Sequence, residues 1–232
     1  MVRILHAGDF HLDSAFGALT PEQSRQRRME SRRSPERLVD WANDHGVQLL
    51  LLAGDLFDGG DLCGDTAPLL AQALAQFRGQ AVIAPGNHDP YTPESPYART
   101  PWSDNVHIFT EDRMQTFSFP ELGCAVHGAA FTAPECPADR VLSGFRAPED
   151  GLIHIGLLHG DVGRAQVGIV CKSLVNQLLQ IGIGEHFLPG SVAEIGGVCL
   201  RNTVGRGVAV KAVDALSEVG RTFVILHDAA TA

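Results

Sequence analysis

The chain has 232 residues, of which 44% are hydrophobic, so it is long enough for one large domain with a substantial buried core. None of its apolar runs approaches the length of a membrane span, and the N-terminal sequence MVRILHAGDF lacks the layout of a signal peptide, so we expect no membrane association. The net charge of −9 excludes a surface that is basic throughout, but it leaves nucleic-acid binding open, because bound cations would cancel the charge of an acidic metal site.

Strands and helices alternate in the N-terminal part of the sequence. Periodicity predicts them in the order Val2–Ala7 (strand), Pro35–His45 (helix), Val47–Ala53 (strand), Thr66–Phe77 (helix) and Gln80–Ala84 (strand). Ser34 is the expected N-cap of the first helix, with Pro35 at its first position and Gly46 just past its end. This order predicts a parallel sheet with right-handed crossovers.

Beyond Thr92 the apolar runs become shorter. Antiparallel strands are expected at Val106–Phe109, Gln115–Phe119 and Cys124–His127, before an apolar strand at residues 152–158. Further along, we expect a helix over Val167–Leu179 and a strand over Thr222–Leu226.

Arginines are concentrated between the first strand and the first helix. If this stretch is helical, Arg25, Arg28 and Arg32 share one face. That face could contact phosphate groups, but a solvated helix surface is the preferred interpretation.

The five cysteines are scattered, odd in number and without a Cys-x-x-Cys pair. This usage is typical of buried thiols in a reducing compartment and not of a disulfide or zinc framework. We therefore expect a cytoplasmic protein.

Several apolar runs end in polar side chains of the kind that bind metals. The runs end as AGDFHLD, LAGDLFDGG, IAPGNHD and LLHGD. In open parallel sheets, ligands bind outside the carboxyl ends of the strands. We therefore expect a shared site at one sheet edge, formed by Asp9, Asp55, Asn87 and His159.

These motifs resemble the calcineurin-like metallophosphoesterase superfamily. The resemblance lies in Asp9-x-His11, Gly54-Asp55-x-x-Asp58, Gly86-Asn87-His88-Asp89 and the later His159. Within the superfamily, LHAGDFHLD, LLLLAGDLFD and APGNHDP are most similar to SbcD-type DNA repair nucleases, the nuclease half of the SbcCD complex. The resemblance covers about residues 1–165 and implies an α/β fold, a sandwich of two central mixed sheets flanked by helices.

The resemblance also implies two divalent metal ions. Asp9 and His11 would hold one ion, Asn87 and His159 would hold the other, and Asp55 would bridge them. Mixed carboxylate, imidazole and amide ligands suit manganese, iron or zinc better than calcium, and manganese is our first expectation.

Three further side chains receive roles beside the metals. As in the family, His88 would contact phosphate and protonate the leaving group. Asp89 would orient His88, or it would cap a turn before Pro90. Asp58 is expected behind the ligands, holding the loop or a ligand histidine.

The resemblance ends after the fourth strand. The family completes both metal sites with a Gly-His-x-His motif, but no His-x-His pair follows His159 in this chain. His186 is a lone candidate, and His227-Asp228 stands too far along the sequence. We therefore divide the chain into a nuclease-like core, residues 1–165, and a divergent, truncated or frame-shifted segment, residues 166–232.

The expected function is metal-dependent phosphodiester hydrolysis with an incomplete metal site. DNA is the leading substrate and an SbcC-like ATPase the implied partner, and a homodimer is a further option. One alternative is a phosphoesterase for nucleotides or small phosphate esters. The other is a catalytically crippled module that keeps the fold and binds DNA or a partner.

Overall fold

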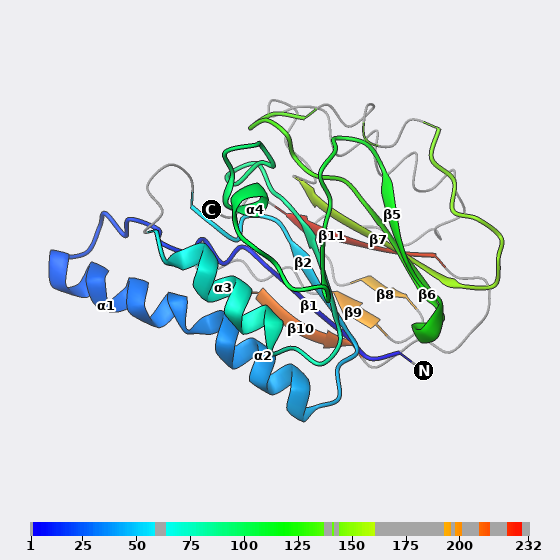
Figure 1. Ribbon diagram of the computed structural model, residues 1–232, viewed down its shortest axis with the longest axis horizontal. Helices are drawn as coiled ribbons and strands as arrows, with labels where there is room; N and C mark the ends of the chain where they lie inside the picture. Colours follow the sequence, from blue (N-terminus) through cyan, green and yellow to red (C-terminus); the bar gives the residue numbers. More distant parts are fainter. Residues whose placement is uncertain are drawn as a thin grey trace.

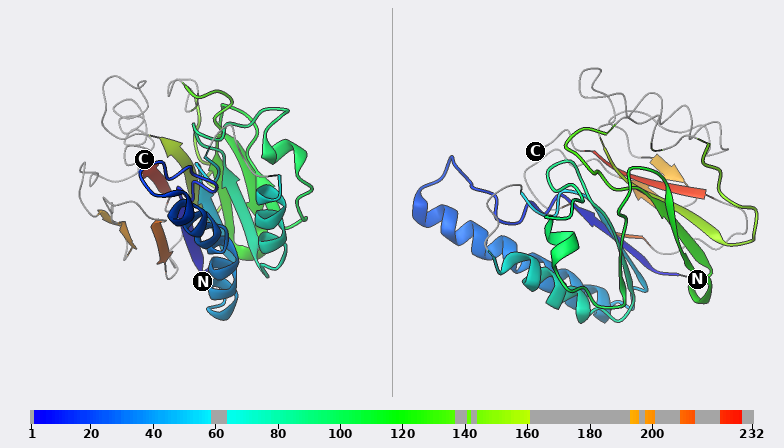
Figure 2. Two further views of the ribbon diagram at one scale, coloured as in Figure 1. Left: turned by 90° about the vertical axis from the view of Figure 1, so that its left-hand side faces the viewer. Right: turned by 45° about the horizontal axis from the view of Figure 1, so that its top comes forward.

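The computed structural model describes residues 2–58, 64–136, 141 and 144–160, together with the backbone of strands at residues 193–195, 198–200, 209–213 and 222–228. Within these residues, two β-sheets lie face to face, and helices cover the outer face of the first sheet (Figures 1 and 2). Each sheet contains both parallel and antiparallel pairs. The predicted α/β sandwich of two mixed sheets is therefore confirmed.

The first sheet carries the N-terminal strands in the spatial order β10-β1-β2-β3-β4. Its strands span Ile4–Gly8 (β1), Leu49–Ala53 (β2), Gln80–Ala84 (β3), Val106–Ile108 (β4) and Ala209–Val213 (β10). Strands β1 to β4 are parallel, whereas β10 runs antiparallel to β1. The carboxyl ends of β1, β2 and β3 therefore lie along one edge of the sheet.

The second sheet has the spatial order β11-β7-β6-β5. Its strands span Gln115–Phe119 (β5), Cys124–Gly128 (β6), Ile153–Gly160 (β7) and Thr222–Asp228 (β11). A separate antiparallel pair is formed by β8 (Ala193–Ile195) and β9 (Val198–Leu200).

The α-helices connect successive strands of the first sheet. They span Pro21–Arg32 (α1), Ser34–Asp44 (α2), Thr66–Ala75 (α3) and Pro96–Arg99 (α4), with a 3-10 turn at Pro120–Leu122. Helix α1 begins with a capping box, in which the Thr20 hydroxyl accepts from the Gln23 N–H and the Gln23 side chain accepts from the Thr20 N–H.

Strand β2 is apolar along its whole length because both of its faces are buried. Leu50 and Leu52 belong to the core that the sheet shares with α2 and α3, whereas Leu49 and Leu51 belong to the core between the two sheets. Full burial of each leucine stabilises the fold by about 1.5–3 kcal/mol relative to exposure. The alternation along β2 therefore holds the helices and both sheets in one stack.

The structure corrects some of the predicted details. Strand β4 is parallel to β3, because the connection through residues 85–105 is long enough to return the chain to the same end of the sheet. Strand β6 is antiparallel to β5 as expected but parallel to β7. Ser34 is the first residue of α2, and the N-cap position belongs to Arg33, whose backbone is helical because α1 ends directly before it.

Strands from the C-terminal segment join both sheets. β10 pairs with β1, and β11, which confirms the strand predicted at Thr222–Leu226, pairs with β7. The helix predicted at Val167–Leu179 lies outside the described residues. Among the helices that are described, none combines the length and apolar character of a membrane span.

Candidate metal centre

The polar residues predicted at the strand ends meet at one edge of the sandwich. Asp9, Asp55 and Asn87 follow β1, β2 and β3 of the first sheet, whereas His159 stands near the end of β7 in the second. The Nε2 atom of His159 lies 3.1 Å from Oδ1 of Asn87 and 3.3 Å from Oδ2 of Asp55. A histidine of one sheet therefore contacts the candidate ligands of the other.

The first motif also reaches the Asp55 carboxylate. His11 Nε2 lies 3.8 Å from Asp55 Oδ2. Asp9, His11 and Asp55 each offer a ligand atom, and these atoms all lie within 4.8 Å of one another. The structure thus brings all five predicted ligands together, with Asp55 Oδ2 facing both His11 and His159.

The donor atoms around Asp55 fit a divalent metal. Oδ1 of Asp55 accepts a hydrogen bond of 3.0 Å from the His88 N–H, which fixes the carboxylate. Oδ2 of Asp55 and Nε2 of His11 are buried and make no hydrogen bond within the described part of the chain. Buried polar atoms without such partners are costly unless another group binds them. A set of carboxylate, imidazole and amide oxygen donors suits manganese, iron or zinc.

The backbone that carries these ligands is held in an unusual conformation. Asp9, His11 and Asp55 have positive φ angles of 52°, 41° and 51°, which cost non-glycine residues on the order of 1 kcal/mol each. Backbone hydrogen bonds from Asp9 to Gly54 (3.1 Å) and from His11 to Asp55 (2.9 Å) join the first and second motifs. The two motif loops therefore hold each other in place.

Small residues allow the two sheets to approach at this point. His159 Nδ1 donates to the Ala53 carbonyl oxygen at 3.2 Å, so that in the neutral ring Nε2 keeps its lone pair on the side of Asp55. A Cβ atom on Gly54 would lie 2.3 Å from His159 Cγ, and one on Gly86 would lie 2.2 Å from Asp55 Oδ1. Glycine is required at both positions.

Burial and nearby charge have opposite effects on the pKa values of Asp55 and His159. Burial raises the pKa of Asp55, but its close contact with His159 and the attraction between the two groups outweigh burial and bring the pKa below its ordinary value. Burial lowers the pKa of His159, but the close contact with Asp55 and the charge of Asp55 raise it above its ordinary value. These buried groups therefore favour positive charge beside Asp55.

Asp58 contacts two histidines at the mouth of the site. Its Oδ1 lies 3.6 Å from His11 Nδ1 and 3.7 Å from His88 Nδ1. The rings of these histidines are arranged edge to face, with centroids 5.3 Å apart. Asp58 therefore lies beside both His11 and His88, and these three side chains form a second group that could hold a metal ion, so its expected place behind the ligands stays a prediction.

Asp89 has a different set of contacts from those we expected. Its buried carboxylate accepts hydrogen bonds from the Tyr97 hydroxyl and from the backbone N–H groups of Asp55, Leu56, Phe57 and Gly86. Burial, and then the negative charge of Asp55, raise the pKa of Asp89 to about 6. These contacts join the loops after β2 and β3, whereas its predicted orientation of His88 stays a prediction.

The predicted arginine face is present on α1, but much of it is already engaged. Arg25 is exposed, whereas Arg28 and Arg32 are half-buried. Arg32 Nε lies 2.7 Å from Asp13 Oδ1, and Arg28 Nη1 donates to the Ala15 carbonyl oxygen at 3.4 Å. Sequence reasoning missed this use of the face, because the partners are not close in sequence.

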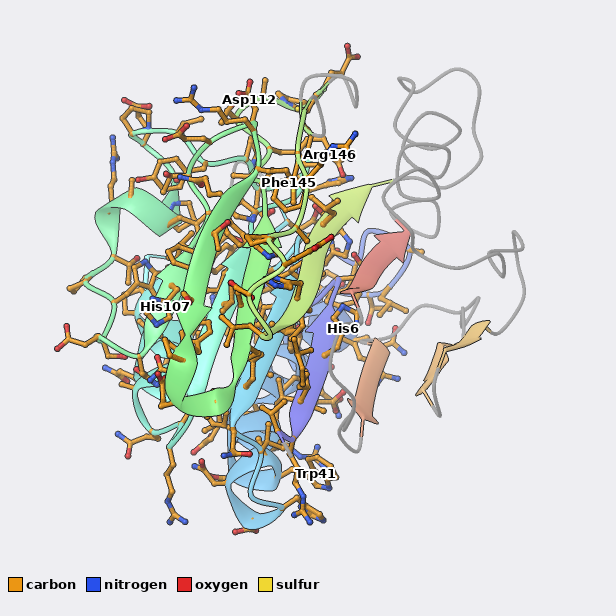
Figure 3. The ribbon with its side chains drawn as sticks, turned by 90° about the vertical axis from the view of Figure 1, so that its right-hand side faces the viewer. His6, Trp41, His107, Asp112, Phe145 and Arg146 are labelled. Atoms are coloured by element: carbon orange, nitrogen blue, oxygen red, sulfur yellow. The ribbon has the colours of Figure 1, made fainter. Side chains whose placement is uncertain are left out.

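A second group of histidines lies away from the candidate centre, on the second sheet. Thr116 Oγ1, His127 and His154 form a chain of hydrogen bonds of 2.8 and 2.9 Å that ends at Asp150 Oδ1, 2.9 Å from His154 Nε2. The ring of Phe145, labelled in Figure 3, lies beside this chain, with its centroid 5.0 Å from that of His127. Both histidines are buried, so this group is a structural network.

The C-terminal segment is described near the centre only as backbone. The register of β11 on β7 sets His227 opposite His159 and Asp228 opposite Gly160. Sequence spacing argues against His227-Asp228 as a substitute for the missing motif, yet the sheet brings both residues to the edge where β7 ends. His186 lies outside the described residues.

Comparison with known proteins identifies metallophosphoesterases as similar to this chain. The family model described as calcineurin-like phosphoesterase matches residues 2–172. A relative from Bacillus subtilis (strain 168), named uncharacterized metallophosphoesterase YhaO, is 30% identical over 171 residues, which cover 70% of this chain and 41% of the relative. A subunit of the nuclease SbcCD from Rhodobacter capsulatus is 35% identical over 94 residues, covering 38% of this chain and 22% of the relative. The chain thus spans less than half of the length of either relative.

Proposed function

The chain belongs to the calcineurin-like phosphoesterase family, and we propose that it is a metal-dependent phosphodiesterase that acts on DNA. The observation that carries this proposal is the meeting of both sheets at Asp55, whose Oδ2 faces His11 at 3.8 Å and His159 at 3.3 Å. The partial similarity to an SbcCD nuclease subunit supports DNA over other phosphodiesters.

The candidate ligands divide into two sets that share Asp55. Asp9 and His11 would complete one set, and Asn87 and His159 the other. Two divalent cations, with manganese as our first expectation, would supply charge neutralisation at the phosphoryl oxygens and a water of lowered pKa. The family dependence on metal and the buried donor atoms of His11 and Asp55 support this assignment.

His88 is placed to manage the proton of the leaving group. Its side chain is 42% exposed, so a substrate reaches it from solvent. With Nδ1 beside Asp58, Nε2 is the nitrogen that would hold a proton for the departing oxygen. Asp58, beside Nδ1, sets which nitrogen of the His88 ring faces the substrate.

Manganese-dependent hydrolysis of bis-p-nitrophenyl phosphate and of linear DNA tests the proposal. We expect hydrolysis of the diester, no hydrolysis with a chelator present, and loss of activity in Asp55→Asn. Diester hydrolysis with no DNA cleavage would favour nucleotides or other small esters as substrates. Stoichiometric manganese binding with no hydrolysis of any phosphate ester would sink the enzymatic proposal.

The absence of a Gly-His-x-His motif from the sequence favours a second candidate, a crippled binding module. With fewer donors, we propose weak metal binding and low turnover. Titrating manganese while following diester hydrolysis distinguishes the two candidates. Saturation at low micromolar manganese with robust DNA cleavage would mean that the site is complete.

The proposal also covers the assembly that the chain forms and its location in the cell. The Rhodobacter relative is named as one subunit of a complex, so we propose an SbcC-like ATPase partner, with a homodimer as the other assembly. Light scattering on the purified chain tests the dimer, and co-purification with such an ATPase tests the complex. We propose a cytoplasmic location, in keeping with five scattered cysteines that include no Cys-x-x-Cys pair.

A further inference from the structure

One face of α1 holds the segment that follows the first motif. The face consists of residues spaced by four, which project from the same side of a helix. Ser24 Oγ donates to the Phe16 carbonyl oxygen at 3.1 Å and Arg28 Nη1 to the Ala15 carbonyl oxygen at 3.4 Å. At the end of the helix, Arg32 Nε donates to Asp13 Oδ1 at 2.7 Å.

Asp13 joins this helix to a third segment. Its second carboxylate oxygen accepts a hydrogen bond from the hydroxyl of Thr66, the first residue of α3. Arg32 Nη1 also lies 3.4 Å from Asp65 Oδ1, beside Thr66. The Asp13 side chain is only 2% exposed, and the Arg32 guanidinium opposes its buried charge. We call Asp13, Arg32 and Thr66 the clamp.

The clamp holds the backbone two residues beyond His11. Asp13 has a φ of 69° and His11 a φ of 41°, so the chain is strained on both sides of Leu12. Leu12 itself is bonded to the second motif, through its N–H to Leu56 (2.9 Å) and its carbonyl oxygen to Asp58 (3.1 Å). A strained segment of this kind persists only where the surrounding contacts over-determine it.

We propose that Asp13 is a positioning residue for the metal centre. By binding Arg32 and Thr66 together, it fixes the strained segment and thereby aims the His11 imidazole at Asp55. This inference deepens the proposed function, because it rests on His11 being a metal ligand. Groups that orient a ligand typically contribute about 10- to 100-fold to metal affinity.

Manganese affinity of the full chain, measured by calorimetry after chelator treatment, tests the clamp. Asp13→Gly removes the carboxylate while allowing a positive φ without strain. Arg32→Gln removes the opposite charge. We expect each to weaken manganese binding about 10-fold, with no further loss in the double variant, because both remove the same interaction. The matched control is Arg27→Gln, which breaks an exposed pair with Glu30 on the same helix and leaves affinity unchanged.

A merely structural role has a different signature. If both variants melt at lower temperature but bind manganese like the wild type below that temperature, the inference is overturned. If Asp13→Gly does not fold, the manganese affinity of Arg32→Gln alone tests the inference. A wild type that binds manganese without hydrolysing esters would refute the proposed function while this test still stands. A wild type that binds no manganese would refute both.

Discussion

The imidazole of His159 packs directly on the backbone of Gly54, where a Cβ atom would lie 2.3 Å from His159 Cγ. Gly54 also has a φ of 64°, a conformation that L side chains rarely adopt. The second sheet therefore reaches the candidate ligands of the first only because residue 54 has no side chain.

Gly54→Ala is expected to separate His159 from Asp55. The overlap and the positive φ together should lower the free energy of unfolding by at least about 2 kcal/mol. Manganese binding should weaken as well, which calorimetry would measure. Gly17→Ala is the matched control, because a Cβ there meets nothing within 4 Å. Equal behaviour of the two variants would contradict the close packing.

Asp55→Ala is expected to abolish binding at both proposed metal positions together, because one carboxylate serves both sets of ligands. Affinity should fall by more than about 100-fold, the upper end for groups that only orient a ligand. Metal analysis of the purified variant would check this. Retention of one tightly bound ion per chain would show that Asp55 does not link the two positions.

His88→Ala is expected to separate chemistry from metal binding. A general acid contributes roughly 10²–10⁴-fold to turnover, so kcat on the diester should fall by this amount. Metal content should stay near that of the wild type, because His88 is proposed to act on the leaving oxygen. Unchanged turnover in His88→Ala would remove His88 from the catalytic role.

Asp58→Asn should lower kcat and also weaken manganese binding, since Asp58 lies beside both His11 and His88.

The histidine network of the second sheet predicts a dependence of stability on pH. Burial, and then the nearby His154, lower the pKa of His127 from 6.5 to about 4. The unfolded chain therefore takes up a proton first on acidification, so the free energy of unfolding falls as the pH drops from about 6.5 to about 4. In His127→Gln, we expect the melting temperature to fall less over this window, by roughly 5 °C. His45→Gln, at the exposed end of α2, should behave like the wild type.

Much of the site followed from the sequence because the ligands occupy strand ends. The apolar runs located β1, β2, β3 and β7, and the carboxyl ends of parallel strands share an edge. The residues after β1, β2 and β3 were therefore expected at one edge, as Asp9, Asp55 and Asn87 are, whereas His159 reaches them from the second sheet. The local sequence pattern was sufficient to predict the position of a ligand that directly follows a single strand.

Relations between distant segments were not predictable in this way. Arg32 reaches Asp13 across 19 residues, and Asp13 reaches Thr66 across 53, so no helical or strand period connects them. The parallel direction of β4 depends on the path of residues 85–105, which has no periodic pattern. The register that brings His227 opposite His159 likewise depends on the pairing of β11 with β7.

Asp89 has a consequence for the hydrogen exchange of the loops around the centre. Loops usually exchange their amide hydrogens by small local openings, with little protection. Here the N–H groups of Asp55, Leu56, Phe57 and Gly86 all donate to one buried carboxylate. Exposing any one of them to solvent requires moving the group that holds the other three. These four amides should therefore exchange slowly and at a common rate, as part of the core's cooperative unit.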